Sequence, residues 1–233
     1  MKDRSIFATR LRHALARRLR PQGKLAFLRA LPPGAAVLDV GCGNDSPRDA
    51  KLLRPDLHYH GLDVADYNQN GSVQFADSYT LTTPAAFADG ILRWQGQMDA
   101  VVSAHNLEHC DDPGAVLAAM ALALRPGGTL YLAFPSEASV GFPRRRGTLN
   151  FFDDPTHQHV PRWDFVLQQL RAQNLKVVFA RPRYRPALLA LAGLLLEPLA
   201  WLTRRNDPLG ASWALYGFES VVWARRPAGD RQP

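Results

Sequence analysis

The chain has 233 residues, of which 46% are hydrophobic, enough for one α/β domain with its own core. Nine of its 28 Lys and Arg residues, but only one of its 21 Asp and Glu residues, lie in the first 30 positions. The rest of the chain is therefore close to neutral, which argues against a general nucleic-acid-binding surface. Two cysteines are too few for a disulfide framework, so we expect a cytoplasmic protein.

Residues 1–31 are expected to form a basic helical extension. Ile6, Leu11 and Leu15 recur at helical spacing with arginines between them, and the segment lacks the continuous apolar core of a signal peptide. Such a helix packs on the domain, covers a bound cofactor or contacts an anionic membrane surface, and packing is the commonest of these roles. We expect residues 32–226 to form the main domain and residues 227–233 a flexible tail.

The stretch Val37–Asp45 combines a strand with a glycine turn. It begins apolar and β-branched, as a buried parallel strand does. Gly41 permits a tight turn, and Gly43 lets the backbone approach a ligand with no Cβ in between. Asp39 lies at the carboxyl end of the strand, where open α/β sheets bind their ligands. The stretch therefore predicts a ligand site at this edge of the sheet.

A second strand is expected over Leu57–Gly61, and Asp63 follows it. Asp63 lies about twenty residues past the glycines, the spacing at which an acid accepts hydrogen bonds from a ribose. Strand, glycine turn and ribose acid together predict a site for an adenosine-containing cofactor.

Val37–Asp45, Asp63 and the run Met98–Pro135 resemble the class I S-adenosylmethionine-dependent methyltransferases. The resemblance implies S-adenosylmethionine as cofactor. It also implies an α/β fold, a Rossmann-like seven-stranded sheet that is mostly parallel, with a final antiparallel strand and helices on both faces. The cofactor-binding residues that it implies are Asp39, Gly41, Cys42, Gly43, Asn44, Asp63, Val64, Asp77, Ser103 and His105.

The middle of the chain predicts the next strands. Val73–Ala76 is expected to be the third strand, with Asp77 directly after it at the place of the family's adenine-binding acid; a turn residue is the alternative. Between Val64 and Ser72 there is little room for a crossover helix, so a loop is expected. Later strands are expected over Met98–Ser103, Thr129–Phe134, Leu175–Ala180 and Trp213–Ala224.

His105 and His109, with Cys110 nearby, are spaced as metal ligands can be. A zinc site needs three or four convergent ligands, so no metal is expected.

Residues 135–160 are expected to form the acceptor site, because loops at the carboxyl ends of the strands hold the substrate in such folds. Methylation of a hydroxyl needs a proton acceptor, and His157 and His159 are the expected catalytic residues, with His105 third. The alternative is that both histidines hold the loop. Arg144–Arg146 either bind a phosphate or carboxylate of the acceptor or are simply solvated.

Two short stretches of the sequence indicate the chemical class of the acceptor. Asp66–Gln69 and Gly147–His157 look like a bacterial methyltransferase subgroup associated with surface-polysaccharide synthesis, which implies a small-molecule or glycan acceptor, methylated on oxygen.

The segment 184–210 is rich in leucine and alanine but is interrupted by Glu197 and Pro198, and is too short to span a bilayer about 30 Å thick. It caps the acceptor site, forms a homodimer interface or touches the inner membrane peripherally.

Two other functions of the protein would share parts of this sequence pattern. A nicotinamide-dependent oxidoreductase shares the glycine turn and ribose acid, and a non-catalytic membrane-associated module would use the basic and leucine-rich segments.

Overall fold

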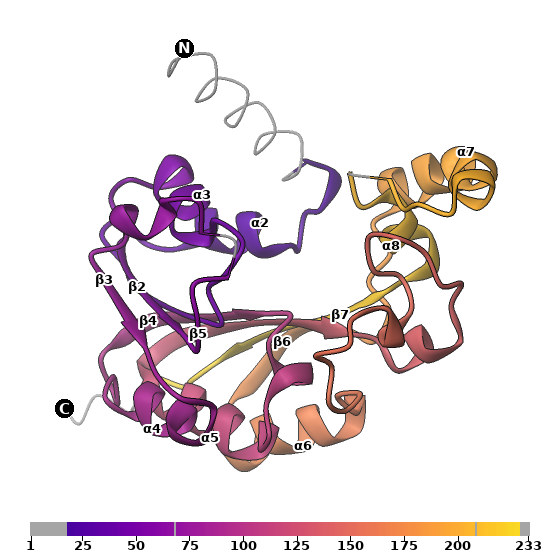
Figure 1. The fold of residues 1–233 in the computed structure, drawn as a ribbon. Helices are drawn as coiled ribbons and strands as arrows, with labels where there is room; N and C mark the ends of the chain where they lie inside the picture. The colour runs from indigo at the N-terminus through magenta and orange to yellow at the C-terminus, as the bar shows by residue number, and fades with distance from the viewer. Residues whose placement is uncertain (1–17, 68, 208, 229–233) are drawn as a thin grey trace.

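The structure, a computed structural model, describes residues 18–67, 69–207 and 209–228. Within them, one seven-stranded sheet organises the chain in the order β3-β2-β1-β4-β5-β7-β6 (Figure 1). β7 runs antiparallel to both β5 and β6, and the other neighbouring strands are parallel. The predicted fold class is confirmed. The strands are β1 (Ala36–Val40), β2 (His58–Asp63), β3 (Ser78–Leu81), β4 (Met98–Ala104), β5 (Leu124–Pro135), β6 (Lys176–Arg181) and β7 (Glu219–Arg225).

Helices cover both faces of the sheet. On one face lie α2 (Lys24–Ala30) and α3 (Ser46–Leu53), and on the other α4 (Phe87–Leu92), α5 (Pro113–Ala123) and α6 (Trp163–Ala172) (Figure 1). Each face has its own apolar core, one built around Phe27, Val37 and Tyr59 and the other around Val101, Met120 and Leu132. Because both faces are covered, the central strands are almost continuously apolar.

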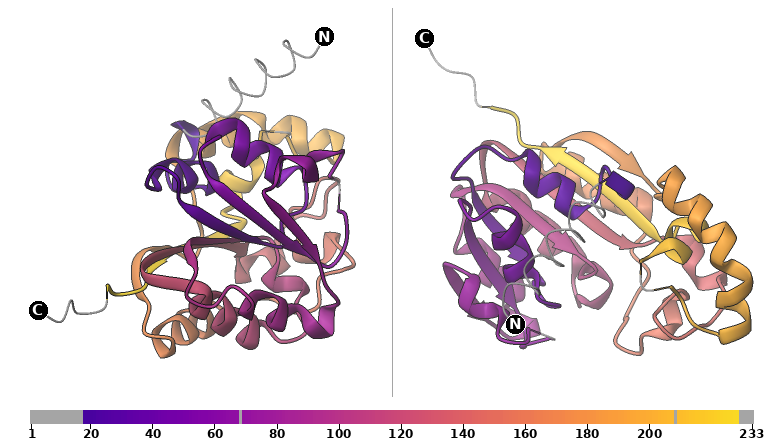
Figure 2. Two further views of the ribbon diagram at one scale, coloured as in Figure 1. Left: turned by 90° about the vertical axis from the view of Figure 1, so that its left-hand side faces the viewer. Right: turned by 90° about the horizontal axis from the view of Figure 1, so that it is seen from above.

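A small lobe stands at the end of the sheet. It consists of α7 (Ala187–Thr203) and α8 (Ala211–Tyr216), which lie together next to the amino end of β7 (Figures 1 and 2). Within the segment 184–210, residues Ala187–Thr203 thus form one continuous helix, with Pro198 inside it. Among the residues described, none of the helices has the length and hydropathy needed to cross a bilayer.

The third strand differs from the prediction. Val73–Ala76 is not a strand, because the 3₁₀ helix η1 (Ser72–Phe75) occupies this stretch after a left-handed turn at Gly71, with φ +75°. The Ser72 hydroxyl accepts the Arg48 N–H of α3 at 3.1 Å, so the segment packs on α3 instead of pairing with β2. β3 begins only at Ser78. The sequence predicted a loop between Val64 and Ser72. Among the described residues, η1 is the one regular element between β2 and β3, which agrees with that prediction.

The last predicted strand also differs. Trp213–Ala224 was expected to be extended throughout, but its first part is helical in α8. Gly217, with φ +66°, ends that helix, and β7 begins two residues later. The predicted antiparallel pairing of this strand is confirmed.

Most of the predicted N-terminal helix lies outside the described residues. Of its apolar positions, Leu19 is described, and it packs against the α7–α8 lobe. In α2, Phe27 and Leu28 are buried in the core of the sheet. The predicted domain boundaries and the flexible tail stay predictions.

Candidate active site

The glycine turn after β1 is held between β2 and the loop after β4. The Gly41 N–H donates to the Leu62 carbonyl at 2.8 Å, and Gly41 has φ +73°. A Cβ on Gly41 would lie 2.6 Å from the Asn106 carboxamide oxygen, so the position has room for glycine alone. Asn44 and Asp45 are also left-handed, with φ 55° and 60°. A turn with this much backbone strain is typical of a functional site.

Asp39 is fully buried beneath the turn. Its Oδ2 accepts hydrogen bonds from Lys24 Nζ at 2.7 Å, Ser46 Oγ at 2.6 Å and the Tyr59 hydroxyl at 2.5 Å. Burial and the Asp39 charge raise the pKa of Tyr59 well above its usual value, so the phenol stays protonated and donates. Asp39 Oδ1 has no hydrogen-bond partner in the described part of the chain. The second oxygen of a buried carboxylate is therefore left for a ligand.

Lys24 is a site residue that the sequence did not single out. Its ammonium group partly offsets the charge of Asp39, with which it forms an ion pair. A basic residue at the start of the helix before the first strand was the available signal.

Asp63 ends β2 and is brought against the glycine turn. Its Oδ1 accepts the Val64 N–H at 2.8 Å, and a Cβ on Gly43 would lie 3.7 Å from its Oδ2. Burial raises the pKa of the Asp63 carboxyl, and backbone N–H groups, including that of Gly43, partly counter this rise. The two motifs that stand about twenty residues apart in the sequence thus meet at one point.

Cys42 contributes backbone rather than thiol to the turn. A Cβ on Gly61 would lie 2.8 Å from Cys42 Sγ, so the thiol points into the sheet, where burial raises its pKa strongly. The Cys42 carbonyl accepts from Gln69 Nε2 at 2.9 Å, and the Asn44 N–H donates to the Tyr67 carbonyl at 2.9 Å. The segment after Val64 therefore closes over the turn.

Asp77 lies at the wrong edge of the sheet for an adenine ligand. Because β3 begins at Ser78, Asp77 precedes that strand, whereas the glycine turn and Asp63 lie at the carboxyl ends of theirs. Its Oδ2 accepts the Tyr59 N–H at 2.7 Å and pairs with Lys51 Nζ at 2.6 Å. The prediction for Asp77 rested on a strand placed too early, and the alternative of a structural turn residue fits its contacts.

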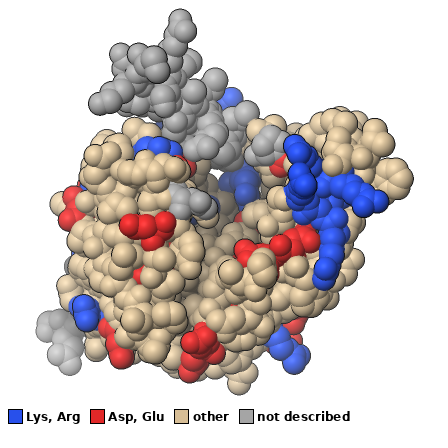
Figure 3. All heavy atoms as spheres, viewed as in Figure 1, with Lys and Arg blue, Asp and Glu red and all other residues tan. Residues whose placement is uncertain are grey.

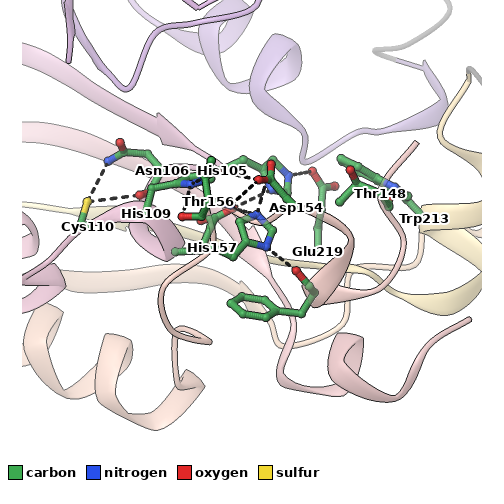
Figure 4. Close-up of polar contacts among 12 residues, drawn as sticks. His105, Asn106, His109, Cys110, Thr148, Asp154, Thr156, His157, Trp213 and Glu219 are labelled. Atoms are coloured by element: carbon green, nitrogen blue, oxygen red, sulfur yellow. Dashed lines mark hydrogen bonds and ion pairs between the residues drawn. The ribbon is translucent and has the colours of Figure 1, made fainter. Parts of the chain in front are cut away.

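The end of β4 carries a second polar group (Figure 4). Ser103 is buried, and its hydroxyl has no partner among the described residues. His105 is left-handed, with φ 54°, and its ring lies between two carboxylates. Nδ1 is 3.2 Å from Glu108 Oε1, and Nε2 is 2.8 Å from Glu219 Oε1. Glu219 also pairs with Arg20.

The structure places the two expected catalytic histidines, His157 and His159, in different surroundings. His157 is nearly buried, and its Nδ1 lies 2.6 Å from the Phe151 carbonyl. His159 is exposed, and its Nε2 lies 2.6 Å from the Cys110 carbonyl. It lines a separate cavity of about 400 Å³ next to α5 and α6. Only His157 thus joins the polar group at the end of β4.

His157 Nε2 faces two carboxylates. Glu108 Oε1 lies at 4.0 Å and Asp154 Oδ2 at 3.9 Å. Figure 4 shows His157 beside Asp154. Glu108, His109 and His157 are also the described residues whose possible metal-ligand atoms converge, all within 4.8 Å of one another. This set differs from the one considered in the sequence, because Glu108 and His157 stand in place of His105 and Cys110. The expectation of no metal stays a prediction.

A sequence model of the methyltransferase domain family matches residues 9–179. The chain belongs to the class I S-adenosylmethionine-dependent methyltransferases. The strand order and the antiparallel β7 agree with the fold expected from the resemblance, whereas a nicotinamide-binding sheet would continue parallel.

Curated relatives of the methyltransferase carry the name ubiquinone biosynthesis O-methyltransferase. The protein of Xanthomonas campestris pv. campestris (strain B100) is 33% identical over 122 residues, which are 49% of this chain and 48% of that protein. The protein of Idiomarina loihiensis is 30% identical over 136 residues, 54% of each. The chain therefore spans about half the length of the curated relatives it matches.

Solved structures support the fold. A methyltransferase from Mesorhizobium loti has a TM-score of 0.57 at 16% identity and covers 87% of this chain and 97% of its own. Phosphoethanolamine N-methyltransferase 2 of Haemonchus contortus, in complex with S-adenosylmethionine, has a TM-score of 0.56 at 15% identity, with 87% and 52% covered.

The residues of this methyltransferase fit the family's cofactor, S-adenosylmethionine. A strained glycine turn without room for a Cβ lies against a buried acid at the end of the next strand. An acceptor oxygen of Asp39 is left free beneath the turn. The cofactor prediction is confirmed.

Proposed function

We propose that this methyltransferase moves the methyl group of S-adenosylmethionine to an oxygen atom of a small-molecule or glycan acceptor. The observation that carries the proposal is the glycine turn and Asp63 at the same edge of the sheet as the polar group of His105, Glu108 and His157. The names of the curated relatives favour oxygen as the methylated atom. A glycan rests on the resemblance of Asp66–Gln69 and Gly147–His157 to the polysaccharide-associated subgroup.

In this proposal the turn and the two acids hold the cofactor. Asp63 accepts hydrogen bonds from the ribose hydroxyls, and Asp39 Oδ1 holds the methionine ammonium directly or through a water. Gly41, Cys42, Gly43 and Asn44 line the methionine portion with backbone. Val64, Ser103 and His105 remain proposed cofactor contacts.

Bound S-adenosylmethionine supplies a methyl group that its sulfonium already makes electrophilic. The chain has to align the acceptor oxygen with that methyl group and exclude water from the site. A hydroxyl acceptor must also lose its proton, so the chain must provide a base.

We assign that role to His157 in preference to His159. The Phe151 carbonyl can only accept, so His157 Nδ1 donates to it, and in the neutral ring Nε2 is the nitrogen free to take a proton. The carboxylates of Glu108 and Asp154 beside Nε2 would stabilise the imidazolium that forms. In His159 the Nε2–H donates to the Cys110 carbonyl, next to a different cavity.

Labelled methyl transfer to sugar, lipid-linked and nucleic-acid acceptors tests the function. We expect transfer to a hydroxyl-bearing acceptor and none to nucleic acid. Calorimetry with S-adenosylmethionine and with a nicotinamide dinucleotide separates the alternatives. Tight nicotinamide binding without S-adenosylmethionine binding would favour an oxidoreductase, and binding without turnover on any acceptor would favour the non-catalytic module. A cytoplasmic location, peripheral membrane contact and a homodimer belong to the same proposal.

A further inference from the structure

Four exposed arginines gather in a cleft beside the acceptor segment. Arg144 and Arg146 come from the loop before η5 (Phe151–Asp153), and Arg204 and Arg205 follow the end of α7. They line a cavity of about 660 Å³, which we call the arginine cleft. Figure 3 shows Lys and Arg side chains gathered on the side of the molecule that carries α7.

The cleft is built by backbone pairing between two distant segments. The Arg146 N–H donates to the Arg204 carbonyl at 3.1 Å, and the Asn206 N–H donates to the Arg146 carbonyl at 2.9 Å. The Asn206 side chain adds a bond to the Gly147 carbonyl at 3.0 Å, across 59 positions of sequence. The guanidinium groups are therefore carried by a joined pair of segments rather than by one free loop.

Arg145 has a different role from its neighbours. Its guanidinium is turned inward and bonds both oxygens of Glu197 on α7, at 2.9 and 2.5 Å. The Tyr216 hydroxyl also donates to Glu197, at 2.6 Å. This ion pair fixes the loop to α7. Arg145 balances the negative charge of Glu197, so that charge does not neutralise the four cleft arginines.

In the part of the chain that the structure describes, the lining of the cleft holds four exposed arginines and one carboxylate, that of Asp153. Asp153 is the acid in its lining, and its Oδ2 accepts the N–H groups of Leu149 at 3.0 Å and Asn150 at 2.9 Å. None of the ion pairs among residues 18–67, 69–207 and 209–228 involves the four cleft guanidinium groups. Like charges held together repel one another, and a bound anion removes that cost. Guanidinium groups match phosphate oxygens with paired hydrogen bonds.

The cleft adjoins the site of methyl transfer. The Thr148 carbonyl, in its wall, accepts a hydrogen bond from the Trp213 indole at 2.5 Å (Figure 4). The ring of Trp213 in turn lies 5.1 Å from the ring of His105. One aromatic side chain, Trp213, therefore contacts both the cleft wall and His105, the residue that follows β4.

We propose that the arginine cleft is a subsite for a phosphate or diphosphate group on the methyl acceptor. The inference rests on the proposed function, because it assigns the cleft to the acceptor of the same reaction. Two sources share this chemistry, a soluble nucleotide-linked sugar and a lipid-linked one. α7, whose end forms one wall of the cleft, exposes Leu195, Trp201 and Leu202 at 76%, 72% and 73% of their surface, where a lipid could lie.

Calorimetry of the full chain with inorganic pyrophosphate tests the subsite. We expect the wild type to bind, and the double variant Arg204→Gln/Arg205→Gln to bind about tenfold more weakly or worse, since hydrogen bonds to charged groups are lost. The matched control Arg93→Gln/Arg171→Gln removes two exposed arginines outside the cleft and should leave binding unchanged. Absence of binding in the wild type, or equal weakening in both variants, would overturn the proposal.

S-adenosylmethionine binding is measured on the same samples. If both double variants bind it as the wild type does, loss of pyrophosphate binding reflects the cleft and not the fold. If S-adenosylmethionine does not bind the wild type, the proposed function fails by itself. If it binds and pyrophosphate does not, only the phosphate subsite fails.

Two further arms separate the sources. Uridine diphosphate represents the soluble source, and phosphatidylcholine vesicles with and without phosphatidic acid represent the lipid source. Sedimentation only with phosphatidic acid, lost in Leu195→Glu/Trp201→Glu while pyrophosphate still binds, supports the lipid-linked phosphate. Binding of uridine diphosphate without sedimentation supports the soluble one, and failure of both ligands overturns the subsite.

Discussion

Two buried carboxyl groups flank the glycine turn, and their surroundings differ. Asp39 has an ammonium group and two hydroxyl groups on one oxygen, whereas Asp63 has backbone N–H groups alone. Burial therefore raises the pKa of Asp63 with no cation to counter it. A ribose whose two hydroxyls donate hydrogen bonds to Asp63 would stabilise the ionised carboxylate. Cofactor binding and the charge of Asp63 are therefore coupled.

Asp63→Asn is expected to separate stability from binding. Because the folded pKa is raised above the unfolded value of about 3.9, protonated Asp63 favours the fold at low pH, and this contribution is lost as pH rises through the folded pKa. The variant should remove that pH dependence and weaken S-adenosylmethionine binding by about 1–3 kcal/mol. Denaturant titrations across this pH range and calorimetry check both effects. An unchanged dissociation constant would remove Asp63 from the site.

His157→Ala is expected to lower turnover by about 10²–10⁴, the scale of general-base loss, with cofactor affinity preserved. His159→Ala is the matched control, because its ring faces the Cys110 carbonyl and a separate cavity. Turnover and calorimetry are measured for both variants. Full activity in His157→Ala would end the assignment, and joint loss of folding and binding would mean that the residue only holds the loop through the Phe151 carbonyl.

At the scale of elements, α2 belongs to the cofactor site as much as to the N-terminal segment. Its apolar side packs Phe27 and Leu28 into the core, and its first residue, Lys24, reaches Asp39 beneath the turn. Lys24, at the start of α2, therefore connects the packing of one face of the sheet to the charge balance around the glycine turn.

Lys24→Met is expected to destabilise the protein by about 3 kcal/mol, because it leaves the buried Asp39 carboxylate without its cation. Adding Asp39→Asn should recover part of that loss, since the uncompensated charge is then removed as well. Denaturant unfolding of the two single variants and the double variant measures this coupling. Additive effects in the double variant would show that the two side chains are energetically independent.

At the scale of the whole molecule, positive charge gathers at two places. One is the arginine cleft, and the other is the first 30 residues of the sequence, of which 1–17 lie outside the described residues. Because Phe27 and Leu28 are core residues, a deletion that tests the N-terminal charge should end at residue 17.

A form lacking residues 1–17 is expected to lose salt-sensitive binding to anionic vesicles while keeping S-adenosylmethionine affinity, because the deletion removes five Lys and Arg residues but no described contact. Vesicle sedimentation at low and high salt, with calorimetry on the same form, measures this. If the full-length protein does not bind anionic vesicles at low salt, the role of this segment is to pack on the domain rather than to contact a membrane.

By itself the sequence determined the fold class, the glycine turn and, through the resemblance, the cofactor, but it misplaced the starts of β3 and β7. Apolar runs and glycine turns are local properties of a sequence. Gly41, Gly43 and Asp63 therefore predicted the cofactor site through their spacing alone. Their contact with each other in the structure follows from the adjacent parallel strands β1 and β2. The position of Asp77 was not predictable in the same way, because the start of β3 depends on how η1 packs against α3.

Only the tertiary structure decided what the polar loops do. His157 and His159 are two positions apart in the sequence, yet one joins Glu108 and the other turns to the Cys110 carbonyl. Arg145 pairs with Glu197, while its neighbours meet Arg204 and Arg205 from beyond α7. The physical reason is the same in each case. Loop side chains take their direction from the distant elements they pack on, and no local pattern of residues encodes those contacts.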